Sequence, residues 1–213
     1  MIYLSNELWF PNVNEAGQDG LLAVGGDLSV ERLLLAYRSG IFPWFNDGDP
    51  ILWWSPDPRM VLFPEKLKVS KSLRRLIRQN PFEVSFNKAF NEVMRQCASI
   101  KRDGQAGTWI TDEMLEAYQR LNDLGHAHSV EIWENGKLVG GLYGIDLPEK
   151  KTFCGESMFS QVSNASKVAL YYLVAHLRSK KYKIIDCQIF NPHLESLGAE
   201  EIERIEFLKY LAH

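Results

Sequence analysis

The sequence predicts an α+β protein in which helices cover both sides of a mixed β-sheet. Beyond the first 60 residues, the apolar patterns follow the order strand, helix, strand, hairpin, strand, helix, strand. Asn135-Gly136 is the strongest short signal for a hairpin. Leu170, Leu173 and Leu177 recur at helical spacing. Elements in this order are typical of a sheet packed between helices.

The composition places the chain among soluble globular proteins. Its 213 residues suit one large domain or two small ones, and 46% hydrophobic residues allow a substantial core. A net charge of −3 argues against a protein that is basic overall, so any polyanion needs a local basic patch. The three cysteines lack metal-ligand spacing and predict reduced thiols in a cytoplasmic protein. We expect neither a signal peptide nor a membrane span.

Residues 1–61 predict a small N-terminal domain, because they are rich in Gly, Pro, Asp and Trp and hold a single helical pattern. Asp27 or Ser29 can cap a helix over Val30–Arg38. The remaining residues, 62–213, would then form the larger, catalytic domain.

An aromatic and proline-rich loop follows this helix and reads GIFPWFNDGDPILWWSPDPR. Loops of this length in a compact domain are usually functional. Aromatic side chains in such a loop can stack on a nucleobase, and Trp44 is the best candidate. Packing into a small aromatic core is an equally good interpretation for Trp53 and Trp54.

A second helix is predicted over Lys71–Gln79, with Ser70 as its cap and Leu73 on its buried face. This helix and the residues just before it are strongly basic. The cations are Lys66, Lys68, Lys71, Arg74, Arg75 and Arg78. They are the best candidates for binding phosphates. A solvated face without a partner is the alternative.

The middle of the chain predicts a strand at FEVSF, a helix over Lys88–Cys97 and a further helix that Thr111 caps. His126 and His128 fall on one face of the strand that opens the hairpin. A metal site needs a third ligand at a clear spacing, and the sequence offers none. We therefore expect no metal.

Residues 138–188 predict the functional centre. They contain a helix that Ser163 or Asn164 can cap, followed by a short apolar strand. Asp186 and Gln188 lie two residues apart on this strand, so their side chains should share a face. An acid and an amide beyond a buried strand lie where such a sheet tends to bind its ligand.

Glu156 is a further candidate, because a carboxylate among the apolar residues of CGESMFS needs a partner or a role. A salt bridge or a surface position is the alternative for Glu156, and the same alternative applies to Asp186 and Gln188. Other kinds of site are weakly supported. The nearby glycines do not form a GxGxxG fingerprint, no phosphate-binding P-loop is present, and Ser157 lacks the turn of a nucleophile elbow.

A resemblance to a known family is carried by eight segments in fixed order: GLLAVGGDLS, GIFPWF, DPILWWSPDPR, GTWIT, GHAHSVE, FCGESMFS, NASK and IDCQ. Together they resemble the leucyl/phenylalanyl-tRNA–protein transferases over nearly the whole chain. The resemblance implies an acetyltransferase-like (GNAT) mixed sheet flanked by helices, with a small N-terminal domain. It implies transfer of Leu or Phe, less readily Met, from aminoacyl-tRNA to the N-terminal Arg or Lys of a protein, which marks that protein for degradation. It implies no metal or coenzyme.

The resemblance also implies roles for individual residues. The pocket for the transferred side chain falls on Leu142, Phe153, Met158, Leu173 and Ile185. The terminal adenosine would stack on Trp44 and Trp109. The catalytic set falls on Asp186 and Gln188, with Glu156 nearby. The tRNA would also be held by the basic helix residues Lys71, Arg74, Arg75 and Arg78.

The chemistry of these residue types suits such a transfer. The donor is an activated ester, and the attacking α-amine, with a pKa of ~8, must be neutral. Asp186 can accept its proton or act by positioning, and Gln188 can donate to the oxyanion that develops at the ester carbonyl.

The sequence leaves two alternative functions open. A coenzyme-A acetyltransferase would need a glycine-containing pyrophosphate loop, which SQVSNASK lacks. A non-catalytic RNA-binding module would explain the aromatic residues and the basic helix, but not the acid and amide pair.

Overall fold

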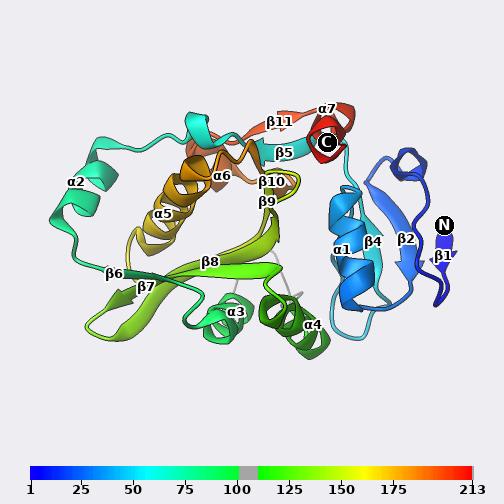
Figure 1. Cartoon of the computed structure of the whole chain (residues 1–213), viewed down its shortest axis with the longest axis horizontal. Helices are drawn as coiled ribbons and strands as arrows, with labels where there is room; N and C mark the ends of the chain where they lie inside the picture. Colours follow the sequence, from blue (N-terminus) through cyan, green and yellow to red (C-terminus); the bar gives the residue numbers. More distant parts are fainter. Residues whose placement is uncertain (101–109, 213) are drawn as a thin grey trace.

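The computed structural model describes residues 1–100 and 110–212 and contains two separate β-sheets (Figure 1). The smaller sheet has four strands in the order β1-β2-β4-β3. Their bounds are β1 Ile2–Leu4, β2 Leu21–Gly25, β3 Phe42–Pro43 and β4 Leu52–Trp54. Helix α1 (Val30–Arg38) lies between this sheet and the rest of the molecule, and the short 3-10 helix η1 (Val13–Glu15) precedes β2.

The larger sheet has seven strands in the order β11-β5-β10-β9-β8-β7-β6. Their bounds are β5 Arg59–Leu62, β6 Glu83–Phe86, β7 Ala127–Glu134, β8 Lys137–Leu147, β9 Thr152–Ser160, β10 Ile184–Gln188 and β11 Glu200–Ile202. The sheet is mixed, because β10 runs parallel to β9 while the other neighbouring strands are antiparallel. The division of the chain near residue 61 stays a prediction.

Helices cover both faces of the larger sheet. Their bounds are η2 Pro64–Lys66, α2 Lys71–Gln79, α3 Phe90–Ser99, α4 Asp112–Asp123, α5 Ala165–Ser179, α6 Pro192–Ser196 and α7 Arg204–Leu211. Figure 1 shows α5 on one face and α3 with α4 on the other. The predicted α+β class, with a mixed sheet flanked by helices, is therefore confirmed. Within the described ranges, no helix is both long and apolar enough to cross a bilayer.

Two of the helices with predicted caps, α1 and α2, have the bounds that the sequence predicts. The hydroxyl of Ser29 accepts a hydrogen bond from the backbone N–H of Arg32 at the start of α1. Ser70 accepts one from Leu73 at the start of α2. The hairpin between β7 and β8 also forms, and both Asn135 and Gly136 adopt the positive φ that its turn requires.

Two helix starts differ from the predictions. Helix α3 begins at Phe90 instead of Lys88. Asn164 does precede α5, but its φ of 67° turns it into the left-handed region and its side chain makes no capping bond. Instead, the hydroxyl of Ser160 accepts the backbone N–H of Ser166. This cap comes from the preceding strand, so local sequence could not indicate it.

Gly140 sets how closely α5 approaches the sheet. A Cβ atom on Gly140 would lie 2.4 Å from the Cβ atom of Ala165, in the first turn of α5. Glycine at this strand position therefore allows the helix backbone to rest on β8, which fixes the helix that forms one wall of the cavity described below.

Arg59, at the start of β5, joins three parts of the molecule and is fully buried. Its Nη1 donates to the carbonyl oxygen of Gly40 at 3.1 Å. Its guanidinium lies 4.9 Å from the ring centroid of Phe42 and 4.8 Å from that of Phe207. Its Nε and Nη2 donate to the two carboxylate oxygens of Asp186 at 2.8 and 2.7 Å. Both charges are thus satisfied inside the protein.

We predict that Arg59→Leu lowers the free energy of unfolding by about 3–5 kcal/mol, because it leaves the carboxylate of Asp186 buried without its partner. Arg38→Leu is the matched control. Arg38 pairs with Glu149 at 2.9 Å, with both side chains more than 40% exposed, so its loss should cost no more than about 1 kcal/mol. Urea unfolding measures both. If the two variants lose the same free energy of unfolding, the buried pair is no more important for stability than the exposed one.

Candidate active site

A cavity of about 700 Å³ lies between the larger sheet and helix α5. Leu142 of β8, Met158 of β9, Leu173 of α5 and Ile185 of β10 line it. These are four of the five residues expected to hold the transferred side chain. The fifth, Phe153, is buried and lines a smaller neighbouring cavity instead.

Strand β3 and the residue after it supply another wall of this cavity through Phe42, Pro43 and Trp44. The carbonyl oxygen of Trp44 accepts a hydrogen bond of 2.6 Å from Nε1 of Trp54, which holds the loop in place. Trp53 is fully buried and donates to Gly25, so it belongs to an aromatic core. Trp44 alone of these three lines the cavity, as a stacking residue must.

Other expected nucleic-acid contacts lie elsewhere. Trp109 lies outside the described residues. The basic side chains of α2 are exposed, and in the described ranges none of them forms an ion pair; they are Lys71, Arg74, Arg75 and Arg78. Figure 1 shows α2 at the far end of the molecule from the four-stranded sheet. The structure therefore does not bring the basic helix to the cavity wall.

A β-bulge separates the expected acid and amide. Asp186 pairs with Val61 and Gln188 with Met60, so Cys187 is the extra residue and simple alternation along the strand does not hold. Gln188 has a φ of 67°, and its side chain lines the cavity. The alternation from which a shared face was predicted therefore does not apply across the bulge: Gln188 lines the cavity, whereas Asp186 does not.

Asp186 lies beneath the cavity with its oxygens already engaged. Oδ1 accepts hydrogen bonds from Nε of Arg59 and from the backbone N–H of Gln188, at 2.8 and 2.9 Å. Oδ2 accepts from Nη2 of Arg59 at 2.7 Å. Asp186 does not line the cavity, but it holds the backbone from which the Gln188 side chain projects.

Glu156 is the carboxylate that faces the cavity. Its Oε1 accepts a hydrogen bond of 2.8 Å from Nε2 of Gln188. Its Oε2 accepts one of 3.2 Å from the hydroxyl of Tyr118, which in turn forms a short hydrogen bond with the hydroxyl of Tyr37. Tyr37 comes from α1 and Tyr118 from α4, so two helices far apart in the sequence support this carboxylate.

Burial raises the pKa of Glu156 to about 7, and the charge of Asp186 contributes, while hydrogen bonds from Tyr37, Gln188 and Tyr118 act in the opposite direction. Burial also raises the pKa of both tyrosines well above the ordinary value, so their hydroxyl groups keep their protons. A carboxyl group with a pKa near neutrality can exchange a proton with a bound amine.

The sequence did not reveal the supporting residues Arg59, Tyr37 and Tyr118. The two tyrosines lie in the apolar stripes of their helices, and a buried tyrosine hydroxyl needs a hydrogen-bond partner. This requirement could have indicated that Tyr37 and Tyr118 take part in a buried polar network, although it does not identify their hydrogen-bond partners. No group of three or more His, Cys, Asp or Glu side chains is placed to hold a metal ion among the residues that the structure describes.

Among solved structures, the chain resembles L-PGS from Bacillus licheniformis with a TM-score of 0.44 and 10% identity, over 80% of this chain and 54% of that one. It also resembles an aminoglycoside acetyltransferase from an uncultured soil metagenomic sample, with a TM-score of 0.42 and 14% identity, over 56% of this chain and 84% of that one. Likenesses at this level are too distant to indicate a function.

Relatives in sequence are much closer. A leucyl/phenylalanyl-tRNA–protein transferase of Flavobacterium psychrophilum is 61% identical over 99% of both chains. One of Syntrophobacter fumaroxidans is 57% identical over 98% of this chain and 88% of that one. The family described as leucyl/phenylalanyl-tRNA protein transferase matches residues 61–212, and its N-terminal domain matches residues 26–57. The chain therefore belongs to the leucyl/phenylalanyl-tRNA–protein transferase family.

Proposed function

We propose that the protein moves Leu or Phe, and less readily Met, from aminoacyl-tRNA to the N-terminal Arg or Lys of an acceptor protein. The observation that supports this most directly is an apolar cavity with Glu156 and Gln188 hydrogen-bonded together in its wall. Family membership supports the same reaction class. The modified protein would then be marked for degradation, and the reaction would take place in the cytoplasm, where aminoacyl-tRNA is found.

The apolar part of the cavity suits the side chain of the donor amino acid. Leu142, Met158 and Ile185 offer only hydrocarbon and thioether surface, which favours Leu, Phe and Met over polar side chains. A shape difference of one methylene group in such a pocket is worth only ~1–3 kcal/mol. Because this energy difference is small, we expect the pocket to accept several apolar donors with a preference among them, and not to select a single one.

The adenosine that carries the amino acid would lie at the N-terminal wall of the cavity, where Trp44 can stack on the base. The body of the tRNA would reach the exposed cations of α2, which would hold phosphates without reading sequence. Binding and chemistry are thus assigned to separate parts of the protein.

The transfer needs no activation beyond the ester. The neutral α-amine of the acceptor attacks the ester carbonyl carbon, an amide bond forms, and the carbon–oxygen bond to the ribose breaks. Gln188 uses one amide N–H on Glu156, so the other is available for the oxyanion. Glu156, with a pKa of about 7, takes the proton from the amine and returns one to the departing ribose oxygen.

Asp186 is assigned a positioning role. Its oxygens are occupied by Arg59 and by the backbone N–H of Gln188, which leaves it badly placed to receive a proton from the substrate. It holds the bulge that directs Gln188 into the cavity, and a displacement of about 1 Å in such a group is costly to catalysis.

The direct test is transfer of labelled Leu from charged tRNA to a peptide that begins with Arg, with an otherwise identical peptide that begins with Gly as the control. We expect incorporation at the N-terminus of the Arg peptide and little in the control. Equal incorporation into both, or into neither, would contradict the proposed acceptor class.

We predict that Gln188→Met lowers the single-turnover transfer rate by about 100-fold or more without raising the apparent KM for charged tRNA, because it removes the oxyanion donor at similar volume. Gln161→Met is the matched control, since Gln161 is exposed and does not line the cavity. A normal rate in Gln188→Met would remove Gln188 from the chemistry.

A second prediction concerns pH. The carboxylate form of Glu156 is the base and becomes populated as pH rises through about 7, so the wild-type transfer rate should rise between pH 6 and 8. Glu156→Gln should lower the rate by about 100-fold and keep only the rise that follows the acceptor amine, whose pKa is ~8. Single-turnover rates across this range measure both effects. A variant with the wild-type profile would show that Glu156 is not the base.

A third prediction concerns tRNA binding. Arg74→Glu combined with Arg75→Glu on α2 should raise the apparent KM for charged tRNA and flatten its dependence on salt, because fewer counterions are released. Arg95→Glu combined with Arg120→Glu is the control, because these residues lie on α3 and α4 at the opposite face of the sheet. If KM and its salt dependence stay the same in both pairs, α2 is only a solvated face.

A further inference from the structure

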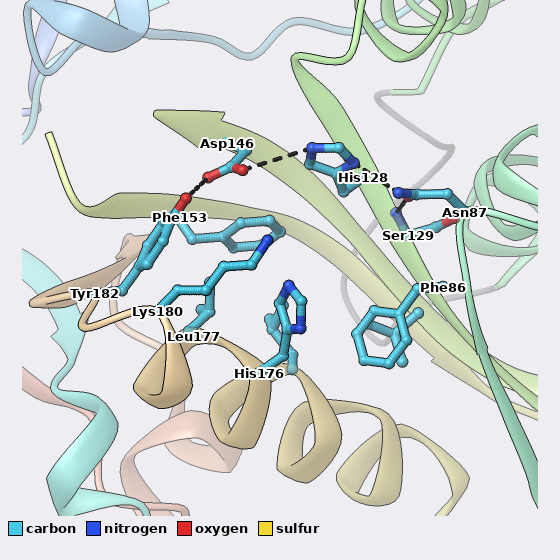
Figure 2. Close-up of a pocket in the computed structure, with 12 residues that line it drawn as sticks. Phe86, Asn87, His128, Ser129, Asp146, Phe153, His176, Leu177, Lys180 and Tyr182 are labelled. Carbon is cyan, nitrogen blue, oxygen red and sulfur yellow. Dashed lines mark hydrogen bonds and ion pairs between the residues drawn. The ribbon is translucent and has the colours of Figure 1, made fainter. Parts of the chain in front are cut away.

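A second, smaller cavity of about 180 Å³ lies between the C-terminal half of α5 and the strands β6, β7 and β8 (Figure 2). Leu173 lines both this cavity and the larger one, so a single side chain forms part of the wall between them. The volume equals that of about six water molecules at ~30 Å³ each. It suits a small molecule and is far too small for a nucleotide.

The base of the small cavity is apolar because of one glycine. A Cβ atom on Gly144 would lie 2.5 Å from the ring of Phe153. Without that atom, the ring of Phe153 rests on β8, where it forms the base of the cavity together with Val130 and Leu177. This base offers a surface for a short hydrocarbon side chain.

The mouth of the cavity is polar, and His128 there is held in its neutral form. The backbone N–H of Ser129 donates to Oδ1 of Asn87 at 2.8 Å, so the amide nitrogen of Asn87 must face Nδ1 of His128, 2.7 Å away. Nδ1 therefore accepts, and the ring proton is on Nε2, which faces Asp146 at 3.5 Å. Burial also lowers the pKa of His128.

Two opposite charges remain at this mouth. Asp146 accepts a hydrogen bond of 2.6 Å from the hydroxyl of Tyr182 and lines the cavity. Lys180 lies across from it, and Figure 2 shows its side chain extending along the mouth. Within the described ranges, the ammonium of Lys180 forms no hydrogen bond or ion pair.

A ligand that complements this arrangement carries both charges. An anion alone would leave Asp146 without a counterion, and a cation alone would leave Lys180 without one. The imidazole of His176 also faces the cavity and stays neutral, because burial lowers its pKa, so it can add a hydrogen bond without adding charge.

We propose that this cavity binds a free α-amino acid with a small apolar side chain. Its carboxylate would pair with Lys180 and accept a hydrogen bond from His176, and its ammonium would pair with Asp146. Its side chain would lie on Phe153 and Leu173. Because Leu173 also lines the larger cavity, the bound amino acid would be one side chain away from the proposed donor site.

The test is calorimetric titration with free L-leucine while a non-hydrolysable leucyl-adenosine analogue saturates the larger cavity. Two further probes separate the charges: leucinamide lacks the carboxylate, and 4-methylpentanoate lacks the ammonium. We expect saturable binding of leucine and at least tenfold weaker binding of both other probes. The proposal would be overturned if leucine does not bind, or if it binds only when the analogue is absent. Leucinamide that binds as tightly as leucine would also overturn it.

Single substitutions test whether leucine binds in this cavity. Lys180→Gln and Asp146→Asn should each weaken leucine binding at least tenfold, and Asp146→Asn keeps an oxygen that can accept from Tyr182. Lys183→Gln is the matched control, because Lys183 is exposed near the same end of α5 but does not line the cavity. Binding of wild-type strength in Lys180→Gln or Asp146→Asn would contradict the proposed contacts.

Discussion

The buried ion pair between Arg59 and Asp186 is the constraint on which the cavity depends. A buried pair of this kind is weak evidence for stability in itself, because removing two charges from water offsets much of their attraction. Its structural consequence is clearer. Arg59 also binds Gly40 and lies against Phe42 and Phe207, so one side chain connects strand β10 to both β3 and α7.

The candidate site follows from this arrangement. Asp186 holds the backbone of the bulge, the bulge turns Gln188 into the cavity, and Gln188 reaches Glu156. Tyr118 approaches Glu156 from the other side. A carboxyl group in this partly enclosed network has a pKa near neutrality, which is the range that proton exchange with an amine requires. Residues that do not line the cavity thus position the pair, Glu156 and Gln188, that does.

Sequence patterns predicted the parts of the fold whose causes are local. Helices α1 and α2 and the Asn135-Gly136 hairpin depend on capping and turn residues that lie within a few positions, and all three form as expected. The start of α5 did not follow its nearest candidates, because its cap comes from Ser160 on the preceding strand. The family resemblance supplied pocket residues, and four of those five line one cavity.

The supporting network could not be predicted in the same way. Arg59 and Asp186 are 127 residues apart, and Tyr37 and Tyr118 are 81 apart, so no local pattern connects the partners. The bulge at Cys187 carries no glycine or other turn signal that would warn against simple alternation. The sequence therefore singled out polar residues of this region as candidates, while the directions of their side chains depend on strand pairing and on contacts between segments far apart in the chain.

A crystal structure with a non-hydrolysable leucyl-adenosine analogue would test this account most directly. The account predicts the leucyl side chain between Met158 and Ile185, with its carbonyl oxygen in hydrogen-bonding distance of Nε2 of Gln188. An analogue bound with its carbonyl turned away from Gln188, or with its leucyl group outside this cavity, would contradict it.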